Sequence, residues 1–371
     1  MGWQESFANV FGPGLLGGTC FGDLCQVLRD NRVRVHPLRL TRLLSALQCS
    51  VMTSLQKRLE ETRFASKWRH VEVSAPVFIL GHWRSGTTHL HNLLTQDDRF
   101  AFPNLYQVLN PHTFLTTERI NTRLTSFLLP DTRFGLDNIR LHWKIPYEDE
   151  FALAVACARS PYLSWVWPRS HESYDRYLTM RSVSEEDVRI WRDSLMTFAK
   201  KLTFKYQKPL ILKSPAHTCR VKLLLDLFPG ARFVHVHRNP YSVFSSTRHL
   251  DVVALRGWTM QSTRSVDWDA RIIERYAEMY DAFFEELPLI PSGQFHEIRF
   301  EDLEQDPIRV VRSIYEALQL PDFAVSETVL REYVGSLSGY QKNTYLEVSD
   351  SLRVRIARKW ERCFQQWGYL S

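Results

Sequence analysis

Residues 81–88 read GHWRSGTT and carry the backbone and hydroxyl groups that bind phosphate. The segment begins with one glycine and has a second five positions later, which is the frame of a nucleotide phosphate loop. An apolar run, residues 77–80, precedes it, and a helical pattern follows over about residues 86–95. In such a strand–loop–helix unit, successive N–H groups and the positive helix end surround an anion. Thr87 and Thr88 add hydroxyl donors.

The position of the cation distinguishes this loop from that of ATPases. An ATP-binding loop carries lysine directly after its second glycine, here Gly86, to contact the β- and γ-phosphates. In this chain Thr87 and Thr88 follow, and the cation is Arg84 inside the loop. Arg84 could instead contact the bridging oxygen of a different phosphate ester. A strand-to-helix turn that binds no ligand would show the same spacing.

A second anion-binding segment begins at Arg238, immediately after the apolar run at residues 231–237. A guanidinium group at the end of a strand can hold a phosphate through two hydrogen bonds. Ser246 follows eight positions later, about two turns into the next predicted helix, where it could contact the same anion. Alone, Arg238 could equally be a surface charge or part of a helix–sheet ion pair.

The two segments together resemble those of the sulfotransferases that use 3′-phosphoadenylyl sulfate (PAPS), in particular the type found widely in bacteria. In that family the first loop holds the 5′-phosphosulfate, and an arginine with a serine eight residues later holds the 3′-phosphate. The resemblance covers roughly residues 76–320, including a late strand–turn–helix segment at residues 300–307. The family often carries lysine at the position of Arg84. The matching positions are Arg84, Ser85, Gly86, Thr87, Thr88, Arg238 and Ser246.

The element pattern and the resemblance predict the same α/β fold. It is a parallel β-sheet flanked by helices, the P-loop NTPase-like sulfotransferase fold, with helical N-terminal and C-terminal additions. The expected strands are residues 77–80, 209–213, 231–237 and 295–300, and the expected helices include residues 86–95, 217–227, a segment from about 240, and 307–318.

We expect two parts along the chain. Residues 1–70 form a helical N-terminal extension, and residues 71–371 form the sulfotransferase domain, with insertions at about residues 97–207 and 250–267. The second insertion has weak periodicity. In the extension, Leu38, Leu40, Leu43, Leu44, Leu47 and Val51 recur at helical spacing, which indicates a packing layer or a wall of the substrate site.

Sulfuryl transfer requires charge stabilisation and in-line positioning, as phosphoryl transfer does. Lys213 ends a predicted strand, so it would lie at the carboxyl edge of the sheet beside the phosphate loop. The resemblance implies that Lys213 steadies the leaving sulfuryl oxygen. A solvent-exposed lysine at a strand end is the alternative.

A base must accept the proton of the acceptor. His217 lies near the position of the catalytic histidine in some cytosolic relatives, although a helix-terminal or core histidine is an equal alternative. Other family members use glutamate, for which Glu148 and Glu150 are the candidates. Burial of one of these carboxyl groups would raise its pKa toward a useful range. A base that carries no sequence signal also stays open.

By resemblance, Lys342 and Asn343 would close over the 3′-phosphate of the donor, although Lys342 could simply lie in a solvated loop. The resemblance implies PAPS as sulfate donor, PAP as product and no required metal. The acidic run at residues 148–150 more often solvates a turn than holds Mg²⁺.

The composition limits partners and compartment. The chain has 371 residues, a net charge of +6 and 13% aromatic residues, with its basic residues spread along the sequence, which argues against nucleic acid. No apolar run approaches a membrane span, and six cysteines without metal spacing favour a reducing, cytoplasmic compartment. The acceptor is a small molecule, lipid or carbohydrate, and peripheral association with a membrane is compatible with the sequence.

The predicted function is transfer of the sulfuryl group of PAPS to a hydroxyl or amine. Two other functions remain open. A P-loop kinase or NTPase would need the missing loop lysine and a Mg²⁺-binding acid. A non-catalytic module that binds adenosine phosphates would keep both anion sites without a base.

Overall fold

The computed structural model describes the whole chain except residues 1–11, 131, 133–139, 264–265 and 338–347. By its contacts the chain divides into two compact units. The first unit contains residues 1–72, 103–207 and 251–266, and the second contains residues 73–102, 208–250 and 267–371. The insertions predicted at residues 97–207 and 250–267 nearly coincide with two segments of the first unit. Division into an extension and one sulfotransferase domain stays a prediction.

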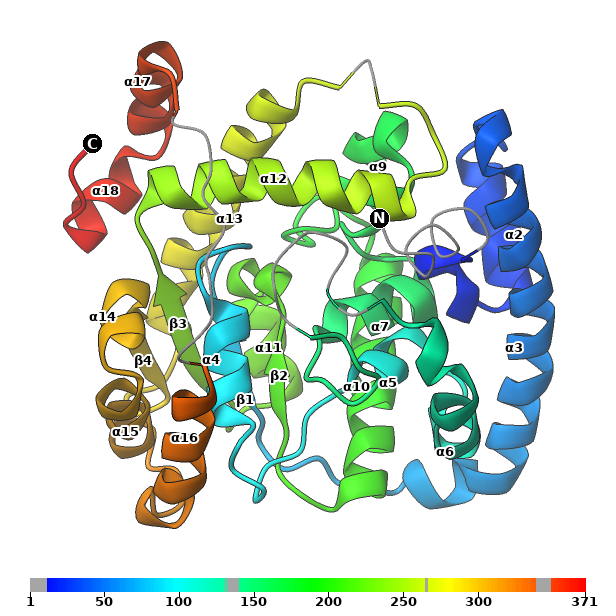
Figure 1. Ribbon diagram of the computed structural model, residues 1–371, viewed down its shortest axis with the longest axis horizontal. Helices are drawn as coiled ribbons and strands as arrows, with labels where there is room; N and C mark the ends of the chain where they lie inside the picture. The colour runs from blue at the N-terminus through cyan, green and yellow to red at the C-terminus, as the bar shows by residue number, and fades with distance from the viewer. Residues whose placement is uncertain (1–11, 131, 133–139, 264–265, 338–347) are drawn as a thin grey trace. The chain divides into compact units, whose positions relative to one another are not determined.

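The second unit is built on a sheet of four parallel strands in the order β2-β1-β3-β4 (Figure 1). The strands are β1 (Val77–Leu80), β2 (Ile211–Lys213), β3 (Arg232–His237) and β4 (Phe295–Arg299). Strand β1 pairs with β2 on one side and with β3 on the other. The chain returns from each strand to the next through helices, as parallel strands require. The predicted fold class is therefore confirmed.

Helices cover both faces of this sheet. Alternate side chains of a strand point to opposite faces, so Val77 and Ile79 join the core beneath α4, α14, α15 and α16. Phe78 points the other way, toward Phe228 and the ring of His217. The helices of this unit are α4 (Thr87–Leu94), η5 (Pro215–Cys219), α11 (Val221–Leu227), α13 (Trp268–Glu286), η6 (Leu287–Leu289), α14 (Phe300–Gln305), α15 (Pro307–Ala317), α16 (Ala324–Ser336), α17 (Asp350–Lys359) and α18 (Glu361–Trp367).

Two predicted helices differ from those observed. The helix expected at residues 217–227 begins as the 3₁₀ helix η5, and α11 starts only at Val221, because Pro215 opens a tight turn after β2. Helix α12 (Pro240–Trp258) continues through much of the segment in which the sequence shows weak periodicity. Residues 250–258, which were assigned to the second insertion, are thus the last part of a helix that begins after β3.

The described part of the first unit is helical and confirms the helical character predicted for residues 1–70. Beside the end of α12, its helices are η1 (Gly14–Gly18), α2 (Phe21–Asp30), η2 (Pro37–Arg39), α3 (Leu40–Trp68), α5 (Leu105–Leu109), α6 (Phe114–Thr125), η3 (Ser126–Leu128), α7 (Asp149–Cys157), α8 (Leu163–Val166), η4 (Pro168–Ser170), α9 (His171–Asp175) and α10 (Glu185–Tyr206). No helix among the described residues is both long enough and apolar enough to cross a membrane.

One expectation for this unit is wrong in part. The apolar residues at helical spacing were expected to form a packing layer or a wall of the substrate site; the packing layer is excluded for Leu38, Leu40, Leu44 and Val51, which are exposed to solvent, and the wall of the substrate site stays a prediction. Periodicity identifies the residues that share a helix face, but it does not determine which face is buried.

Three buried histidines of the second unit make its stability depend on pH. Burial lowers the pKa of His82 to about 3 and that of His237 to about 4, and it lowers the pKa of His91 well below the ordinary value. The unfolded chain therefore takes up these protons below about pH 6.5, whereas the folded chain does not. The free energy of unfolding must fall as the pH falls from about 6.5 toward these lowered values.

We expect urea-induced unfolding followed at pH 7.5, 6 and 5 to show this loss. These three groups should together add up to about 4 kcal/mol per pH unit to the fall in the free energy of unfolding below pH 6, since each contributes up to about 1.4 kcal/mol. Replacement His237→Phe should reduce the slope by about one proton, because the ring contact with Trp367 can persist without the titration. His70→Ala, at an exposed position, serves as control and should leave the slope unchanged. A pH-independent free energy would contradict the assignment of neutral buried histidines.

Candidate active site

The loop after β1 adopts a backbone conformation that two glycines make accessible. Gly81 has φ +140° and Gly86 has φ +104°, both in the region that favours glycine. A Cβ atom at Gly81 would lie 2.5 Å from the carbonyl oxygen of Val236. A Cβ atom at Gly86 would lie 2.1 Å from the ring of Phe300. The glycine spacing found in the sequence is therefore a steric requirement of this loop.

Long-range hydrogen bonds fix the loop from its first residues. The N–H group of Gly81 donates to Thr218 Oγ1 (2.8 Å), and the N–H group of His82 donates to the hydroxyl of Tyr280 (3.2 Å). Helix α4 then begins at Thr87, and the first N–H group to bond within it is that of Leu90, to Gly86 O. The preceding N–H groups have no acceptor inside the helix and form its positive end. This arrangement is suited to an anion.

Arg84 connects the loop to the second predicted anion site. It lies in the left-handed region at φ +69°, and its Nε donates to Ser246 Oγ at 2.7 Å. Arg238, the first residue after β3, donates from Nη1 to the carbonyl oxygen of Arg84 at 3.3 Å. The structure thus brings together Arg84, Arg238 and Ser246, although more than 150 residues separate Arg84 from Arg238.

Lys213 lies on the opposite side of the loop. It is the last residue of β2 and pairs in register with Ile79 of β1, so its strand ends beside the loop. Its Nζ donates to Thr88 Oγ1 at 3.3 Å. Only 2% of Lys213 is exposed, which excludes the alternative of a solvent-exposed lysine.

Phe300 organises both anion-binding segments. The guanidinium carbon of Arg238 lies 4.5 Å from the centre of its ring, a cation–π contact. The same ring fills the space next to Gly86, where a side chain would clash. Phe300 opens α14 directly after β4, so the neighbouring strand of the sheet positions it.

The loop residues fit a phosphate-containing ligand. The Ser85 hydroxyl is buried and has no hydrogen-bond partner among the described residues. Two cationic side chains, Arg84 and Lys213, contact hydroxyl groups on opposite sides of the loop. Such a donor set, without a carboxylate among these contacts, is suited to a phosphosulfate or phosphate group.

His217 is fully buried in η5, and its ring meets Phe78 edge-on at 5.4 Å between centres. This contact places the imidazole against the core of the sheet, four residues after Lys213. Its role as the base stays a prediction.

The two glutamates predicted as alternative bases belong to the first unit. Glu148 is the residue before α7, and the hydroxyl of Tyr162 donates a hydrogen bond to its Oε2. Glu150 is fully buried in the first turn of α7. Their assignment as bases therefore also stays a prediction.

Lys342 and Asn343 lie outside the described residues.

Sequence reasoning missed the residues that support the loop from a distance. Thr218 and Tyr280 contact it from two different elements, and no motif marks them, whereas Phe300 opens the segment at residues 300–307 that the family resemblance includes. No role was assigned from the sequence to His91, which lies one turn into α4. It is fully buried, and neither ring nitrogen has a partner among the described residues. Burial and the nearby charge of Lys213 both lower its pKa.

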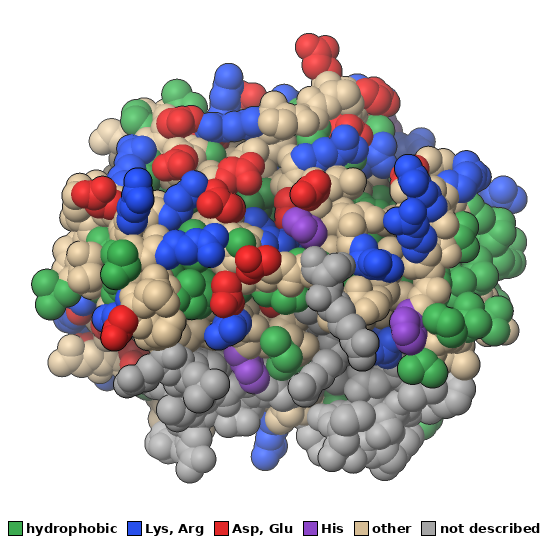
Figure 2. All heavy atoms as spheres, turned by 90° about the horizontal axis from the view of Figure 1, so that it is seen from above, with side chains coloured by type: hydrophobic (Ala, Val, Ile, Leu, Met, Phe, Trp, Pro, Cys, Tyr) green, Lys and Arg blue, Asp and Glu red, His purple; other side chains and the backbone are tan. Residues whose placement is uncertain are grey.

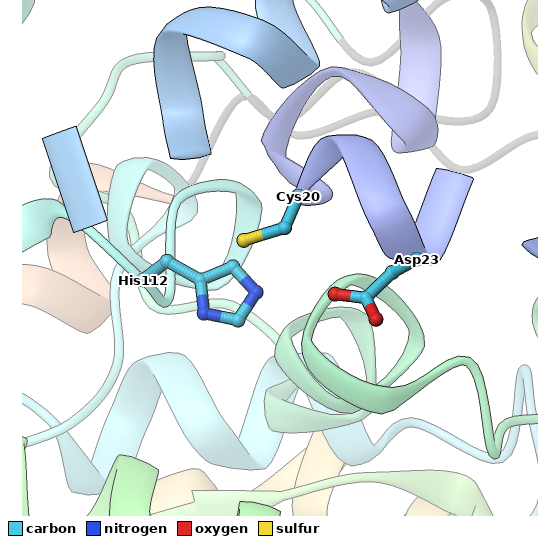
Figure 3. Close-up of side chains that lie close together, drawn as sticks. All are labelled: Cys20, Asp23 and His112. Carbon is cyan, nitrogen blue, oxygen red and sulfur yellow. The ribbon is translucent and has the colours of Figure 1, made fainter. Parts of the chain in front are cut away.

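A separate cluster in the first unit has the composition of a metal site. Cys20, Asp23 and His112 direct their side chains toward one another, with ligand atoms within 4.8 Å (Figure 3). Burial raises the pKa of Cys20 and that of Asp23, and the nearby positive charge of Lys57 offsets part of this rise; burial and Lys57 together lower the pKa of His112 to about 3. Because this ammonium group already supplies a cation, the cluster gives weak support for a metal ion.

Three comparisons place the chain among known proteins. A model of the sulfotransferase family matches residues 76–324. The omega-hydroxy-beta-dihydromenaquinone-9 sulfotransferases Stf3 of Mycobacterium bovis and Mycobacterium tuberculosis are each 33% identical over 368 residues, which is 99% of this chain and 93% of the relative.

Solved structures show the same fold. Sulfotransferase STF9 from Mycobacterium avium superposes with a TM-score of 0.69 at 19% identity, covering 91% of this chain and 87% of that one. STF1 from Mycobacterium tuberculosis H37Rv gives 0.64 at 18% identity, covering 91% and 92%. The family match extends over the phosphate loop, Lys213, Arg238 and Ser246, and the full-length relative covers the remainder. The chain therefore belongs to the sulfotransferase family and is a PAPS-dependent enzyme.

Proposed function

We propose that this sulfotransferase transfers the sulfuryl group of PAPS to the hydroxyl group of an apolar, lipid-type acceptor of the menaquinol class. The observation that carries the acceptor class is the match to Stf3, which acts on ω-hydroxy-β-dihydromenaquinone-9 and aligns with this chain over 99% of its length. A relative that aligns almost end to end shares the segments outside the donor-binding loop, and these segments determine the acceptor.

Aromatic side chains of the first unit support an acceptor with a flat ring. Phe151 lies edge-on to Tyr162 at 4.8 Å and to Trp258 at 5.2 Å, and Trp165 adjoins both Tyr162 and Trp258. The Glu148 carboxylate accepts the hydrogen bond of Tyr162 and so adjoins this cluster. Phe151, Tyr162 and Trp165 are buried against one another, and the partly exposed Trp258 is the member of the cluster on which a quinol ring would pack.

Each end of the donor has its own group of residues. The hydroxyl of Ser85 and the N–H groups of Gly86, Thr87 and Thr88 would hold the 5′-phosphosulfate. Arg238 and Ser246 would hold the 3′-phosphate. The contacts from Arg84 to Ser246 and from Arg238 to the Arg84 backbone keep these two groups adjacent, as one ribose carrying both phosphates requires. Lys342 and Asn343 are proposed to contact the same 3′-phosphate.

In the transfer, the oxygen that bridges the sulfur and the 5′-phosphate stays on the leaving nucleotide. The bond between sulfur and the 5′-phosphate oxygen breaks, a bond between sulfur and the acceptor oxygen forms, and PAP leaves. Lys213 and Arg84 stabilise the negative charge that develops on the leaving oxygen. The acceptor proton passes to His217, or to Glu148 or Glu150. We propose that these cations fulfil the role that a metal ion has in phosphoryl transfer.

A cytoplasmic location stays a prediction.

Substitutions at the two anion sites should separate binding from chemistry. Arg238→Ala removes charge-assisted hydrogen bonds, so calorimetry should show PAP binding weakened about 10- to 100-fold. Turnover at saturating donor should change little. Arg84→Ala and Lys213→Ala should lower kcat by about 10²- to 10³-fold. Arg312→Ala removes an exposed arginine that pairs with Glu327 and serves as a matched control. Equal turnover in all four variants, or tighter binding of ATP·Mg²⁺ than of PAP, would refute the assignment.

The base can be identified from the pH dependence of kcat. The enzyme should lose activity on the acid side as its base becomes protonated, and the variant that lacks the base should lose this limb together with most of its activity. We therefore expect either His217→Gln or Glu148→Gln, but not both, to remove the acid limb, with Glu150→Gln as a third arm. An acid limb that persists in all three variants would show that another group is the base.

The acceptor class is tested with ³⁵S-labelled PAPS and product detection by mass spectrometry. An ω-hydroxylated prenyl quinol should become sulfated, while the same quinol without the terminal hydroxyl should not. A hydroxylated sugar and an arylamine are the comparison acceptors. Addition of EDTA should leave the rate unchanged if the protein cations suffice. Transfer only to the sugar or to the amine would overturn the proposed acceptor class.

A further inference from the structure

Helix α3 has its apolar and polar faces reversed relative to an ordinary surface helix. Its buried residues are Arg42, Ala46, Ser50, Thr53, Glu60 and Ala65. Its exposed large apolar residues are Leu40, Leu44, Val51, Met52, Leu55 and Leu59, with exposed fractions from 47% to 66%. An ordinary surface helix turns its apolar stripe toward the core. Here a set of apolar side chains at helical spacing faces outward.

Polar contacts hold α3 in this orientation. Glu60 is 1% exposed and pairs with Lys201 of α10 at 2.5 Å. The same carboxylate accepts a hydrogen bond from the N–H group of Thr116 at 3.0 Å. Turning the helix over would bury the leucines but leave Lys201 without its carboxylate partner, at a cost of several kcal/mol. The outward apolar face is therefore a fixed feature of the first unit.

The outward apolar face is long, and no exposed residue of α3 from Leu40 to Lys57 is charged; Arg58, beside Leu59, is the first exposed charge. From Leu40 to Lys57 the exposed polar residues of α3 are Thr41 and Gln48. The exposed apolar residues from Leu40 to Leu59 span about 30 Å of helix. Figure 2 shows a continuous group of hydrophobic side chains at its right-hand edge, on the side where Figure 1 draws α2 and α3. Contiguous apolar surface of this kind marks an interaction site.

Basic side chains flank this face at both ends. Between residues 31 and 69, Glu61 is the one exposed acidic residue. The exposed basic residues of the same stretch are Arg32 and Arg34 before the helix, and Arg58, Arg63, Lys67 and Arg69 at its end. An apolar stripe between clusters of arginine and lysine is the pattern of a helix that lies in the plane of a membrane interface.

We propose that α3 lies on the surface of an anionic lipid bilayer, with Leu40, Leu44, Met52, Leu55 and Leu59 inserted among the acyl chains and the flanking basic groups against the lipid headgroups. A second copy of the chain is a poorer occupant. If two α3 helices packed face to face, antiparallel or parallel, basic ends would meet basic ends. The proposal rests on the proposed function in one respect, because a menaquinol-class acceptor resides in a bilayer.

Vesicle flotation tests the proposal directly. The wild-type protein should float with phosphatidylcholine–phosphatidylglycerol vesicles at a 7:3 ratio, and much less with pure phosphatidylcholine. The double variant Leu44→Glu, Leu55→Glu should lose at least tenfold in partitioning, because two charged groups would have to enter the acyl region. Arg58→Glu with Arg63→Glu should weaken binding to the anionic vesicles and reduce its dependence on salt. Val354→Glu, at a residue of α17 that is 70% exposed, is the matched control and should float like the wild type.

Two further measurements separate this proposal from the proposed function. All variants should bind PAP as the wild type does, which shows that they are folded. The Leu44→Glu, Leu55→Glu variant should sulfate a detergent-solubilised quinol at the wild-type rate but lose activity on the same quinol in anionic vesicles. If no quinol is sulfated, the acceptor proposal fails while flotation still decides the membrane proposal. Flotation unaffected by the leucine substitutions, or a wild-type dimer in light scattering that these substitutions dissociate, would overturn the membrane proposal.

Discussion

The site depends on one interaction, the attraction between an anion and the backbone N–H groups that follow β1. These groups can converge only if the chain turns sharply from β1 into α4, and the turn places Gly81, Arg84 and Gly86 at positive φ. Parallel pairing of β1 with both β2 and β3 then puts the ends of all three strands at one edge of the sheet. Lys213 and Arg238 reach the loop because their strands end there.

Buried polar groups have different effects in the two units: in the second they make stability depend on pH, and in the first they determine the orientation of a helix. In the second unit, neutral histidines such as His82 and His237 lie among aromatic rings and make folding sensitive to acid. In the first unit, the buried contact between Glu60 and Lys201 determines which face of α3 points outward. A buried ion pair contributes little net stability but strongly disfavours arrangements that separate its members. The leucines of α3 are exposed for this reason, because the orientation that would bury them would separate Glu60 from Lys201.

Features that depend on local chemistry could be predicted from the sequence. The strands are short apolar runs, and both anion-binding segments follow such runs directly, so the contact between Arg84 and Ser246 is the geometry expected of a shared ligand site. The division of the helix after β2 was not predicted, since Pro215 allows either a 3₁₀ turn or a regular helical start.

Features that depend on contacts between distant residues could not be predicted. Thr218 and Tyr280 support the loop from elements far along the chain, and nothing in their neighbourhoods marks that role. The orientation of α3 depends on Lys201, which lies 141 residues after Glu60, the residue it pairs with. Only the folded chain shows which stripe of the helix is covered.

The strand order has a consequence for how the protein is made. β1 is an interior strand of the sheet, yet both of its neighbours are translated only after residues 103–207 have been synthesised. During that interval an apolar strand with two open edges precedes a loop that cannot yet adopt its shape. Open strand edges invite association with other chains. Successful biogenesis of this enzyme therefore depends on protecting one four-residue segment of the nascent polypeptide until β2 and β3 arrive.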